Sequence, residues 1–294
     1  MHISKYQIFL KAVECGNFSK AAELLNFTQP GISHAVQALE DELGVTLLSR
    51  NRGGVTLTAD GRALLPKIKQ LCAVYHNLEQ AASDLKGMGT GLVRVATFSS
   101  VSAQWLPSIL KGFGRIYPHI EFEVVTGDYY DQIEEWIITG QVDCGFLRLP
   151  SIKKLRVYPL HQDTLQVILP CDHPAANNQT VSAELLATEP FIQLEEGDDY
   201  EIMAAFDDMG IRPRVRYIAR EDRTILSMVS NGLGISLLPE LMIRHSPYPI
   251  SVCQPPKVFY RNIAIAVKDE KAASNSTARF VEYVQKWVKE NRER

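Results

Sequence analysis

Residues 26–45, NFTQPGISHAVQALEDELGV, place two different faces on one predicted helix. The first face has the i, i+4, i+7, i+11 spacing of a buried helical stripe and consists of Ile32, Val36, Leu39 and Leu43. The second has the same helical period but short, weakly charged groups, and consists of Pro30, Ser33, His34 and Gln37. The apolar face predicts packing against neighbouring helices, so the polar face is the one free to contact another molecule.

Two shorter helices are predicted before this one. The first covers residues 4–15 and stops at Gly16, and the second covers residues 19–25 with Ser19 as its N-cap. Thr28 can cap the third helix, and Pro30 fits its first turn, where a missing N–H costs little. Helices joined in this way form either a DNA-binding helix-turn-helix or a plain helical hairpin in a core.

A predicted β-hairpin follows the third helix and favours the DNA-binding alternative. Strand-like pieces at residues 46–48 and 55–57 flank the run Arg50-Asn51-Arg52-Gly53-Gly54. Such a hairpin reads as the wing of a winged helix-turn-helix, with Arg50 and Arg52 placed to contact phosphates.

A long helix with a heptad pattern is predicted after the wing. Its apolar positions alternate by four and three residues and are Leu64, Ile68, Leu71, Tyr75, Leu78, Ala82 and Leu85. A 3.5-residue repeat held this long predicts a coiled-coil seam between two copies of the chain. The alternative is a helix that packs into the core of its own chain. Residues 86–91, KGMGTG, then read as a flexible linker.

The motif FSKAAELLNFTQPGISHAVQALEDELGVTLLSR, followed by LTADGRALL, resembles the amino-terminal signature of LysR-type transcriptional regulators. The resemblance implies a winged helix-turn-helix at residues 1–58 with its motif at about 18–37, a dimerisation helix and hinge at 59–90, and an effector domain at 91–294. It implies DNA contacts by Thr28, Gln29, Pro30, Ser33, His34, Gln37, Arg50 and Arg52. After Ser33 the family commonly has a longer polar or basic residue, whereas this chain has His34 and Ala35.

The remaining two hundred residues alternate predicted strands and helices, which makes the chain α/β overall. They resemble a periplasmic-binding-protein-like domain with two α/β halves, residues 91–162 plus 267–294 and residues 163–266. Small molecules are expected between such halves, at the carboxyl ends of strands. By this resemblance the effector-binding positions are Ser99, Ser100, Ser102, Asp128, Arg148, Gln193 and Glu195.

The charge of the expected ligand stays open at this stage. Arg148 and the serine-rich helix start at 99–102 favour a carboxylate or another anion. The acidic stretch LEEGDD at residues 194–199 favours an amine or a zwitterion.

Several classes of protein are disfavoured by composition and motifs. The net charge of −3 gives no general sign of nucleic-acid binding, and no apolar run approaches a membrane span. Five scattered cysteines without a C-x-x-C pair predict reduced thiols in the cytoplasm and no metal cluster. No nucleophile elbow, zinc-protease or P-loop motif is present, so we expect no enzyme and no resident cofactor.

The expected partners are those that the resemblance to LysR-type regulators implies. They are double-stranded operator DNA, a second copy of the chain in a homodimer that doubles to a homotetramer, a small-molecule co-inducer, and RNA polymerase. An effector-binding module without a DNA role is the competing class, and the wing argues against it.

Overall fold

The computed structural model describes residues 4–51, 54–85, 91–195, 201–269 and 273–291. The chain divides into two compact units, residues 1–88 with 139–142, and residues 89–138 with 143–294. In the described part of the chain, no helix combines the length and apolar character needed to cross a lipid bilayer.

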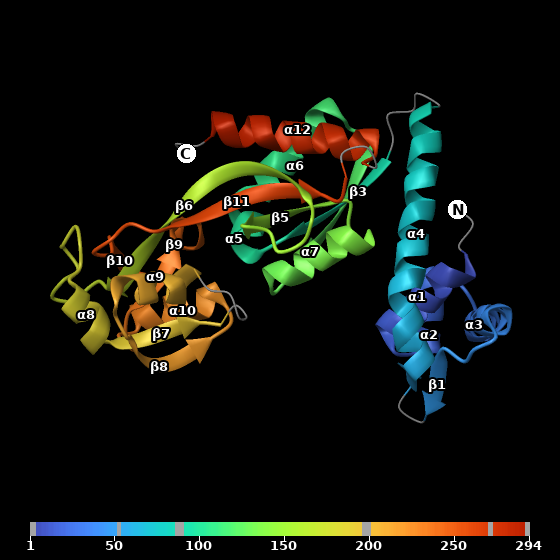
Figure 1. Ribbon diagram of the computed structural model, residues 1–294, viewed down its shortest axis with the longest axis horizontal. Helices are drawn as coiled ribbons and strands as arrows, with labels where there is room; N and C mark the ends of the chain where they lie inside the picture. The colour runs from blue at the N-terminus through green and yellow to red at the C-terminus, as the bar shows by residue number, and fades with distance from the viewer. Residues whose placement is uncertain (1–3, 52–53, 86–90, 196–200, 270–272, 292–294) are drawn as a thin grey trace. The chain divides into compact units, whose positions relative to one another are not determined.

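The first unit is a winged helix-turn-helix followed by one long helix (Figure 1). Its elements are α1 Lys5–Cys15, α2 Phe18–Leu25, α3 Gln29–Leu43, β1 Leu48–Asn51, β2 Gly54–Leu57 and α4 Ala59–Leu85. The two strands pair antiparallel, from Leu48 opposite Leu57 to Asn51 opposite Gly54. These elements confirm the predicted architecture. The predicted linker at 86–91 lies, except for Gly91, outside the described residues.

Asn17, and not the predicted Ser19, caps α2. The Asn17 Oδ1 atom accepts hydrogen bonds from the backbone N–H of Ser19 at 2.7 Å and of Lys20 at 3.3 Å. Phe18 therefore becomes the first helical residue, and its buried ring joins the core of the unit.

The core of the first unit lies between α1, α2 and α3 and is closed by the start of α4. Ile32, Val36 and Leu39 are fully buried there, as predicted. Leu43 is 38% exposed, so its prediction as a core residue was wrong. It is the last residue of α3, where Gly44 turns the chain away in a left-handed conformation.

The second unit is built on a seven-stranded sheet with the order β10-β6-β11-β5-β3-β4 and with β9 paired to β6. Its first elements are β3 Gly91–Thr97, α5 Ser99–Gln104, α6 Leu106–Ile116, β4 Ile120–Thr126, α7 Tyr130–Thr139, β5 Cys144–Leu149 and β6 Arg156–Pro170. The later elements are α8 Ala183–Thr188, β7 Pro190–Leu194, α9 Glu201–Met209, β8 Arg214–Ala219, α10 Asp222–Ser230, β9 Ser236–Pro239, α11 Glu240–Ile243, β10 Ile250–Cys253, β11 Tyr260–Val267 and α12 Asn275–Glu290.

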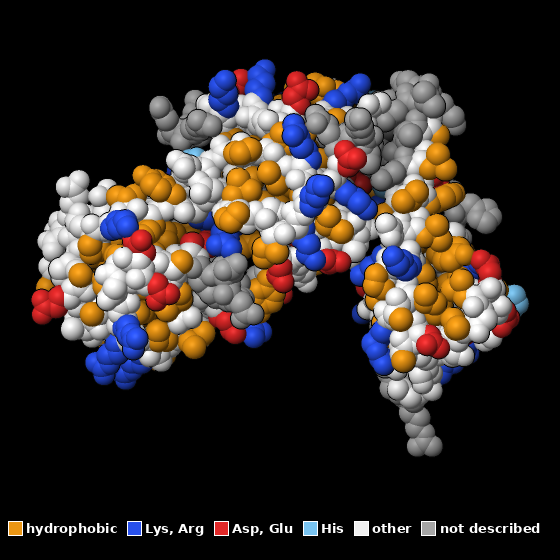
Figure 2. All heavy atoms as spheres, viewed as in Figure 1, with side chains coloured by type: hydrophobic (Ala, Val, Ile, Leu, Met, Phe, Trp, Pro, Cys, Tyr) orange, Lys and Arg blue, Asp and Glu red, His pale blue; other side chains and the backbone are white. Residues whose placement is uncertain are grey.

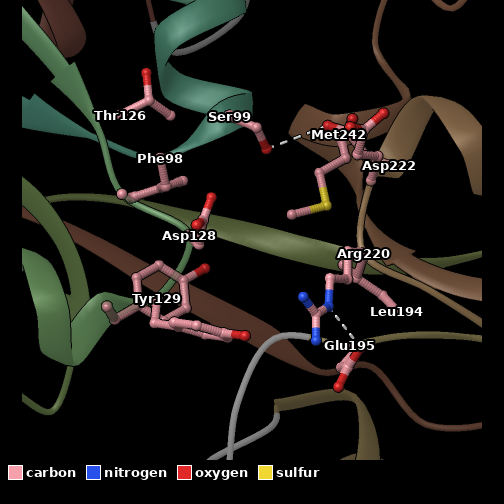
Figure 3. A pocket seen from close by; sticks show the side chains of 13 residues that line it. Phe98, Ser99, Thr126, Asp128, Tyr129, Leu194, Glu195, Arg220, Asp222 and Met242 are labelled. Atoms are coloured by element: carbon pink, nitrogen blue, oxygen red, sulfur yellow. Dashed lines mark hydrogen bonds and ion pairs between the residues drawn. The ribbon is translucent and has the colours of Figure 1, made fainter. Parts of the chain in front are cut away.

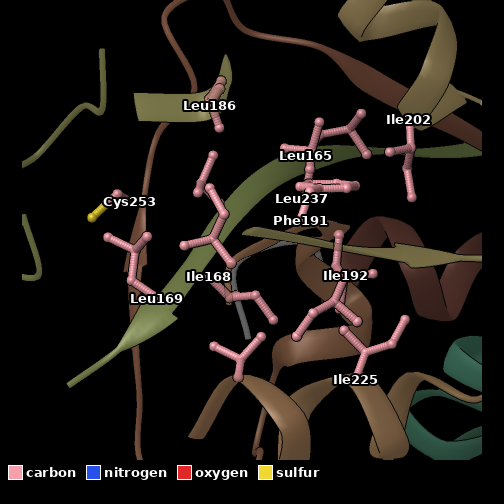
Figure 4. Packing of buried hydrophobic residues seen from close by; sticks show 14 of the residues in the cluster. Leu165, Ile168, Leu169, Leu186, Phe191, Ile192, Ile202, Ile225, Leu237 and Cys253 are labelled. Atoms are coloured by element: carbon pink, nitrogen blue, oxygen red, sulfur yellow. The ribbon is translucent and has the colours of Figure 1, made fainter. Parts of the chain in front are cut away.

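Each half of this unit has its own packing. In the first half, α6 and α12 cover one side of the sheet, where Phe113 meets Phe122 and Phe280 edge-on or nearly so (Figure 1). In the second half, the parallel pair β7–β8 and the strands β6 and β9 enclose a large aliphatic core with α9 and α10 (Figure 4). The two predicted α/β halves are therefore present.

The long strands β6 and β11 carry the chain between the halves. β6 pairs with β11 as far as Thr164 and then with β9 from Leu165, close to the predicted division at 162/163. β11 pairs with β5 from Asn262 to Ala266 and so belongs to the first half. β11 thus enters the sheet of the first half at Asn262, before the predicted division at 266/267.

Candidate DNA-binding surface and effector cavity

The polar face of α3 is accessible along its length. Thr28, Gln29, Pro30, His34 and Gln37 are exposed and Ser33 is half-buried. The Thr28 hydroxyl accepts a hydrogen bond from the backbone N–H of Gly31 at 3.3 Å, which fixes the amino end of the helix. The Gln37 side chain donates to Asp41 Oδ1 at 2.9 Å. This exposed face is free to enter a DNA groove, because the opposite face of the helix is buried in the core.

Glu40 joins α3 to the wing, a connection that the sequence reasoning missed. This buried carboxylate lies on the inner face of α3, and its Oε1 atom accepts hydrogen bonds from the backbone N–H of Leu47 at 2.6 Å and of Leu48 at 2.9 Å. A buried acid in an otherwise apolar helical stripe was the available signal, since buried carboxylates require partners.

The wing is also tied to the end of α1. The backbone N–H of Val55 donates to Gly16 O at 2.8 Å. Gly54 lies so close to this carbonyl that an added Cβ atom would stand 2.2 Å from it. Arg50 is exposed on β1, and its guanidinium lies 5.1 Å from the centre of the Phe18 ring. Arg52 lies outside the described residues.

The heptad positions of α4 fall into two groups. Ile68 is buried in the core of the first unit and Leu64 packs against that core, so their assignment to an intermolecular seam was wrong. Farther along, Leu71 is 48% exposed, Tyr75 42% and Leu78 63%. Hydrophobic side chains follow this part of α4 in Figure 2, and Val74 at 61% extends the stripe. The side chain of Leu85 lies outside the described residues.

A cavity of about 280 Å³ lies between the two halves of the second unit (Figure 3). It is formed where β3, β4, β7 and β8 end and the chain enters the following loops and helices. Its lining consists of Phe98, Ser99, Thr126, Gly127, Asp128, Tyr129, Tyr130, Leu194, Glu195, Arg220, Glu221, Asp222 and Met242. The location agrees with the rule that ligands of such folds bind beyond strand carboxyl ends.

Three of the predicted effector positions, Ser99, Asp128 and Glu195, line this cavity. Ser99 donates a hydrogen bond to Asp222 Oδ2 at 3.3 Å, which links the first half to the second. Gln193 and Ser102 do not line the cavity. Gln193 lies within β7, before the strand end, and Ser102 is farther along the short helix α5.

Ser100 and Arg148 do not line this cavity, and both side chains bind residues elsewhere. Ser100 is buried and its hydroxyl accepts a hydrogen bond from Arg261 Nη2 at 3.1 Å. Arg148 pairs with the largely buried carboxylate of Glu201, with Nη1 at 3.4 Å from Oε2. A one-residue step along a helix turns a side chain by about 100°, which is why Ser99 and Ser100 differ.

The sequence reasoning missed Arg220, Glu221 and Asp222, although they obey the rule used for the other positions. β7 and β8 are parallel, so Glu195 and Arg220, which follow them, emerge at the same edge. Arg220 Nε donates to Glu195 Oε2 at 2.9 Å. That hydrogen bond and the attraction between the two charges lower the pKa of Glu195 and raise the pKa of Arg220.

Comparison with known proteins identifies the family of both domains. The family model of the bacterial regulatory helix-turn-helix protein, lysR family, matches residues 3–62, and that of the LysR substrate binding domain matches residues 86–289. The uncharacterized HTH-type transcriptional regulator YvbU of Bacillus subtilis is 32% identical and aligns over 96% of this chain and 97% of its own. The probable regulator LrrA of Synechococcus elongatus is 31% identical over 91% of this chain and 90% of its own.

Solved structures show the same fold. CbnR, a LysR family transcriptional regulator, superposes with a TM-score of 0.74 at 23% identity and covers 98% of this chain and 99% of its own. Full-length CbnR complexed with its target DNA gives a TM-score of 0.73 at 24% identity, over 97% and 99% of the two chains. The family comprises regulators and not enzymes. The chain belongs to the LysR family of DNA-binding transcriptional regulators, with an effector-binding domain after its helix-turn-helix.

Proposed function

We propose that this regulator acts in the cytoplasm as a homodimer, doubled to a homotetramer, and that a small-molecule co-inducer in the cavity switches its contacts with operator DNA and RNA polymerase. The observation that carries the proposal is the exposed apolar stripe of Leu71, Val74, Tyr75 and Leu78 on α4. A long helix with such a stripe needs a partner, and a second copy presents the same stripe. Pairing two copies also supplies two reading helices related by symmetry.

The polar face of α3 would read the operator. Gln29, Ser33, His34 and Gln37 would contact base edges or nearby phosphates, while Thr28, Arg50 and Arg52 would contact the DNA backbone. Because the α3 face is nearly uncharged, affinity would depend on the wing arginines, the helix amino ends and the dimer's two-fold symmetry. Glu40 would set the wing at a fixed distance from α3.

The cavity would hold the co-inducer, and no resident cofactor is proposed. Its walls come from both halves of the second unit, which β6 and β11 join. A ligand that contacts both walls stabilises one relative setting of the halves and shifts the population toward it. In the assembled protein such a shift would change the spacing and bend of bound DNA.

The oligomer is tested by light scattering after size exclusion on the full chain and on Leu78→Glu. We expect the wild type to be at least dimeric and the variant to shift to lower mass and lose operator binding in a gel shift. The matched control is Ile152→Glu, since Ile152 is 66% exposed but lies outside α4. A Leu78→Glu protein with the mass of the wild type and of the control would refute pairing through this stripe.

A further inference from the structure

Resting on the proposed effector role of the cavity, we infer that its ligand is a compact organic cation, an amine that is protonated at neutral pH. The inference concerns the chemical class of the co-inducer, which the sequence left open between an anion and an amine. It follows from the charges, the walls and the size of the cavity.

Acidic side chains dominate the lining of the cavity. Among the lining residues that the structure describes, four are acidic, Asp128, Glu195, Glu221 and Asp222, and one is basic, Arg220. Arg220 already holds Glu195 through a hydrogen bond of 2.9 Å, so this pair is close to neutral as it stands. The described lining therefore carries four carboxylates against one guanidinium, and an anionic ligand would face this negative excess.

The remaining carboxylates come from opposite walls. Asp128 follows β4 in the first half, whereas Asp222 is the first residue of α10 in the second half. Figure 3 shows both around the same space, with Ser99 joined to Asp222. An ammonium group between them can donate charge-assisted hydrogen bonds to both halves, which is the contact that a switch requires.

Two arginines lie next to aromatic residues of the cavity lining, but each forms an ion pair with a carboxylate of its own. Arg261 lies 5.1 Å from the centre of the Phe98 ring and pairs with buried Asp163. Arg148 lies 5.6 Å from the centre of the Tyr130 ring and pairs with Glu201. These paired guanidiniums leave the negative balance of the lining unchanged.

The volume limits the ligand to a small metabolite. About 280 Å³ lies at the lower end of the range of roughly 300–1,000 Å³ found for small-molecule sites. The ligand is thus a short amine and not a large polycation.

A charge series of equal chain length tests the inference by calorimetry on the full-length protein. Putrescine, 4-aminobutanoate and succinate share a four-carbon chain and carry two, one and no ammonium groups. We expect affinity to fall in that order, and Asp128→Asn and Asp222→Asn each to weaken putrescine about tenfold. Asp207→Asn is the matched control, because Asp207 is exposed on α9 and does not line the cavity.

Succinate binding most tightly, with its affinity reduced by Tyr129→Ala, would overturn the cation inference and leave the co-inducer proposal standing. Putrescine binding that is the same in the wild type and in both aspartate variants would also overturn the inference, since the amine would then be bound elsewhere. If no member of the series binds, the inference is decided by the following measurement.

A measurement of local charge does not depend on finding the natural effector. Thr126→Cys places a thiol on the cavity lining, and Cys171 is exposed elsewhere as an internal reference. Two methanethiosulfonate reagents are compared, one with a trimethylammonium group and one with a sulfonate group. Mass spectrometry of the peptides gives the rate at which each reagent modifies each cysteine. For each cysteine we divide the modification rate of the cationic reagent by that of the anionic reagent. This ratio should be about tenfold higher at position 126 than at Cys171. It should fall when Asp128→Asn is added. An equal ratio at the two positions would overturn the inference and leave the co-inducer proposal standing, because that proposal does not fix the charge of the ligand.

Discussion

Arg261 and Asp163 face each other across β11 and β6 and form a buried ion pair, with side chains 0% and 2% exposed. The same guanidinium donates to Ser100 Oγ and to Tyr130 Oη, both at 3.1 Å. The Asp163 carboxylate also accepts from the backbone N–H of Leu241 at 3.0 Å. The pair therefore lies on the two strands that connect the halves and fixes elements on both sides of the cavity.

Removing one member of this pair should destabilise the effector domain strongly. Asp163→Asn leaves the Arg261 charge buried without its counter-ion. We expect the free energy of unfolding to fall by about 3–5 kcal/mol, and thermal melting measures this loss. The double variant Asp163→Leu/Arg261→Met should be less destabilised than the sum of the two single changes, because it buries no lone charge. Additive losses would show that the two charges do not act as a pair.

Glu40→Ala should loosen the wing from the recognition helix. The change leaves the backbone N–H groups of Leu47 and Leu48 without their acceptor, and it should cost about 1–3 kcal/mol of stability. Glu40→Gln keeps an acceptor oxygen and should recover part of the loss. The control is Glu23→Ala on the exposed face of α2, which should lie within about 0.5 kcal/mol of the wild type. Equal melting of the Glu40→Ala and control proteins would contradict this role.

The sequence predicted those parts of the fold that depend on local periodicity and capping. Most of the α3 stripe, the Thr28 cap and the second wing strand agree with the sequence prediction, since each is decided within a few neighbouring residues. The first wing strand is Leu48–Asn51 and not the predicted 46–48. Ser19 is a candidate cap by sequence, because any hydroxyl at a helix start can accept from a free backbone N–H. The preceding Asn17 caps the helix instead, because its side-chain Oδ1 atom accepts hydrogen bonds from two backbone N–H groups.

Features that depend on contacts between residues far apart in the chain could not be predicted from the sequence. The heptad spacing could not reveal that Ile68 enters the core of its own unit while Leu78 stays exposed, since both obey one period. Arg148 was predicted to face a ligand because Glu201, its partner, lies far along the chain and carries no local signal. The cavity residues Arg220 and Asp222 were missed because they follow a strand whose partner, β7, is known only from the fold.

Gln29→Ala and Ser33→Ala should weaken operator binding selectively. If their side chains contact base edges directly, each change should cost about 1–3 kcal/mol for the operator and little for random DNA. Competition gel shifts at one fixed salt concentration measure the ratio of the two affinities. Unchanged discrimination in both variants would exclude direct base contacts by these residues, because both proteins keep the buried face of α3 intact.

Arg50→Ala should weaken binding to all DNA by about the same factor. Its guanidinium is exposed on the wing and lies against the Phe18 ring, so it is placed to meet a phosphate and not a base edge. Loss of one phosphate contact per subunit should flatten the dependence of log affinity on log salt by about 0.9 for each subunit bound. Fluorescence anisotropy with operator and random duplexes across a salt series gives both slopes. Lys111→Ala, an exposed cation on α6, is the control and should leave the slope unchanged. A variant that lost operator affinity alone, with an unchanged slope, would assign Arg50 to base reading instead.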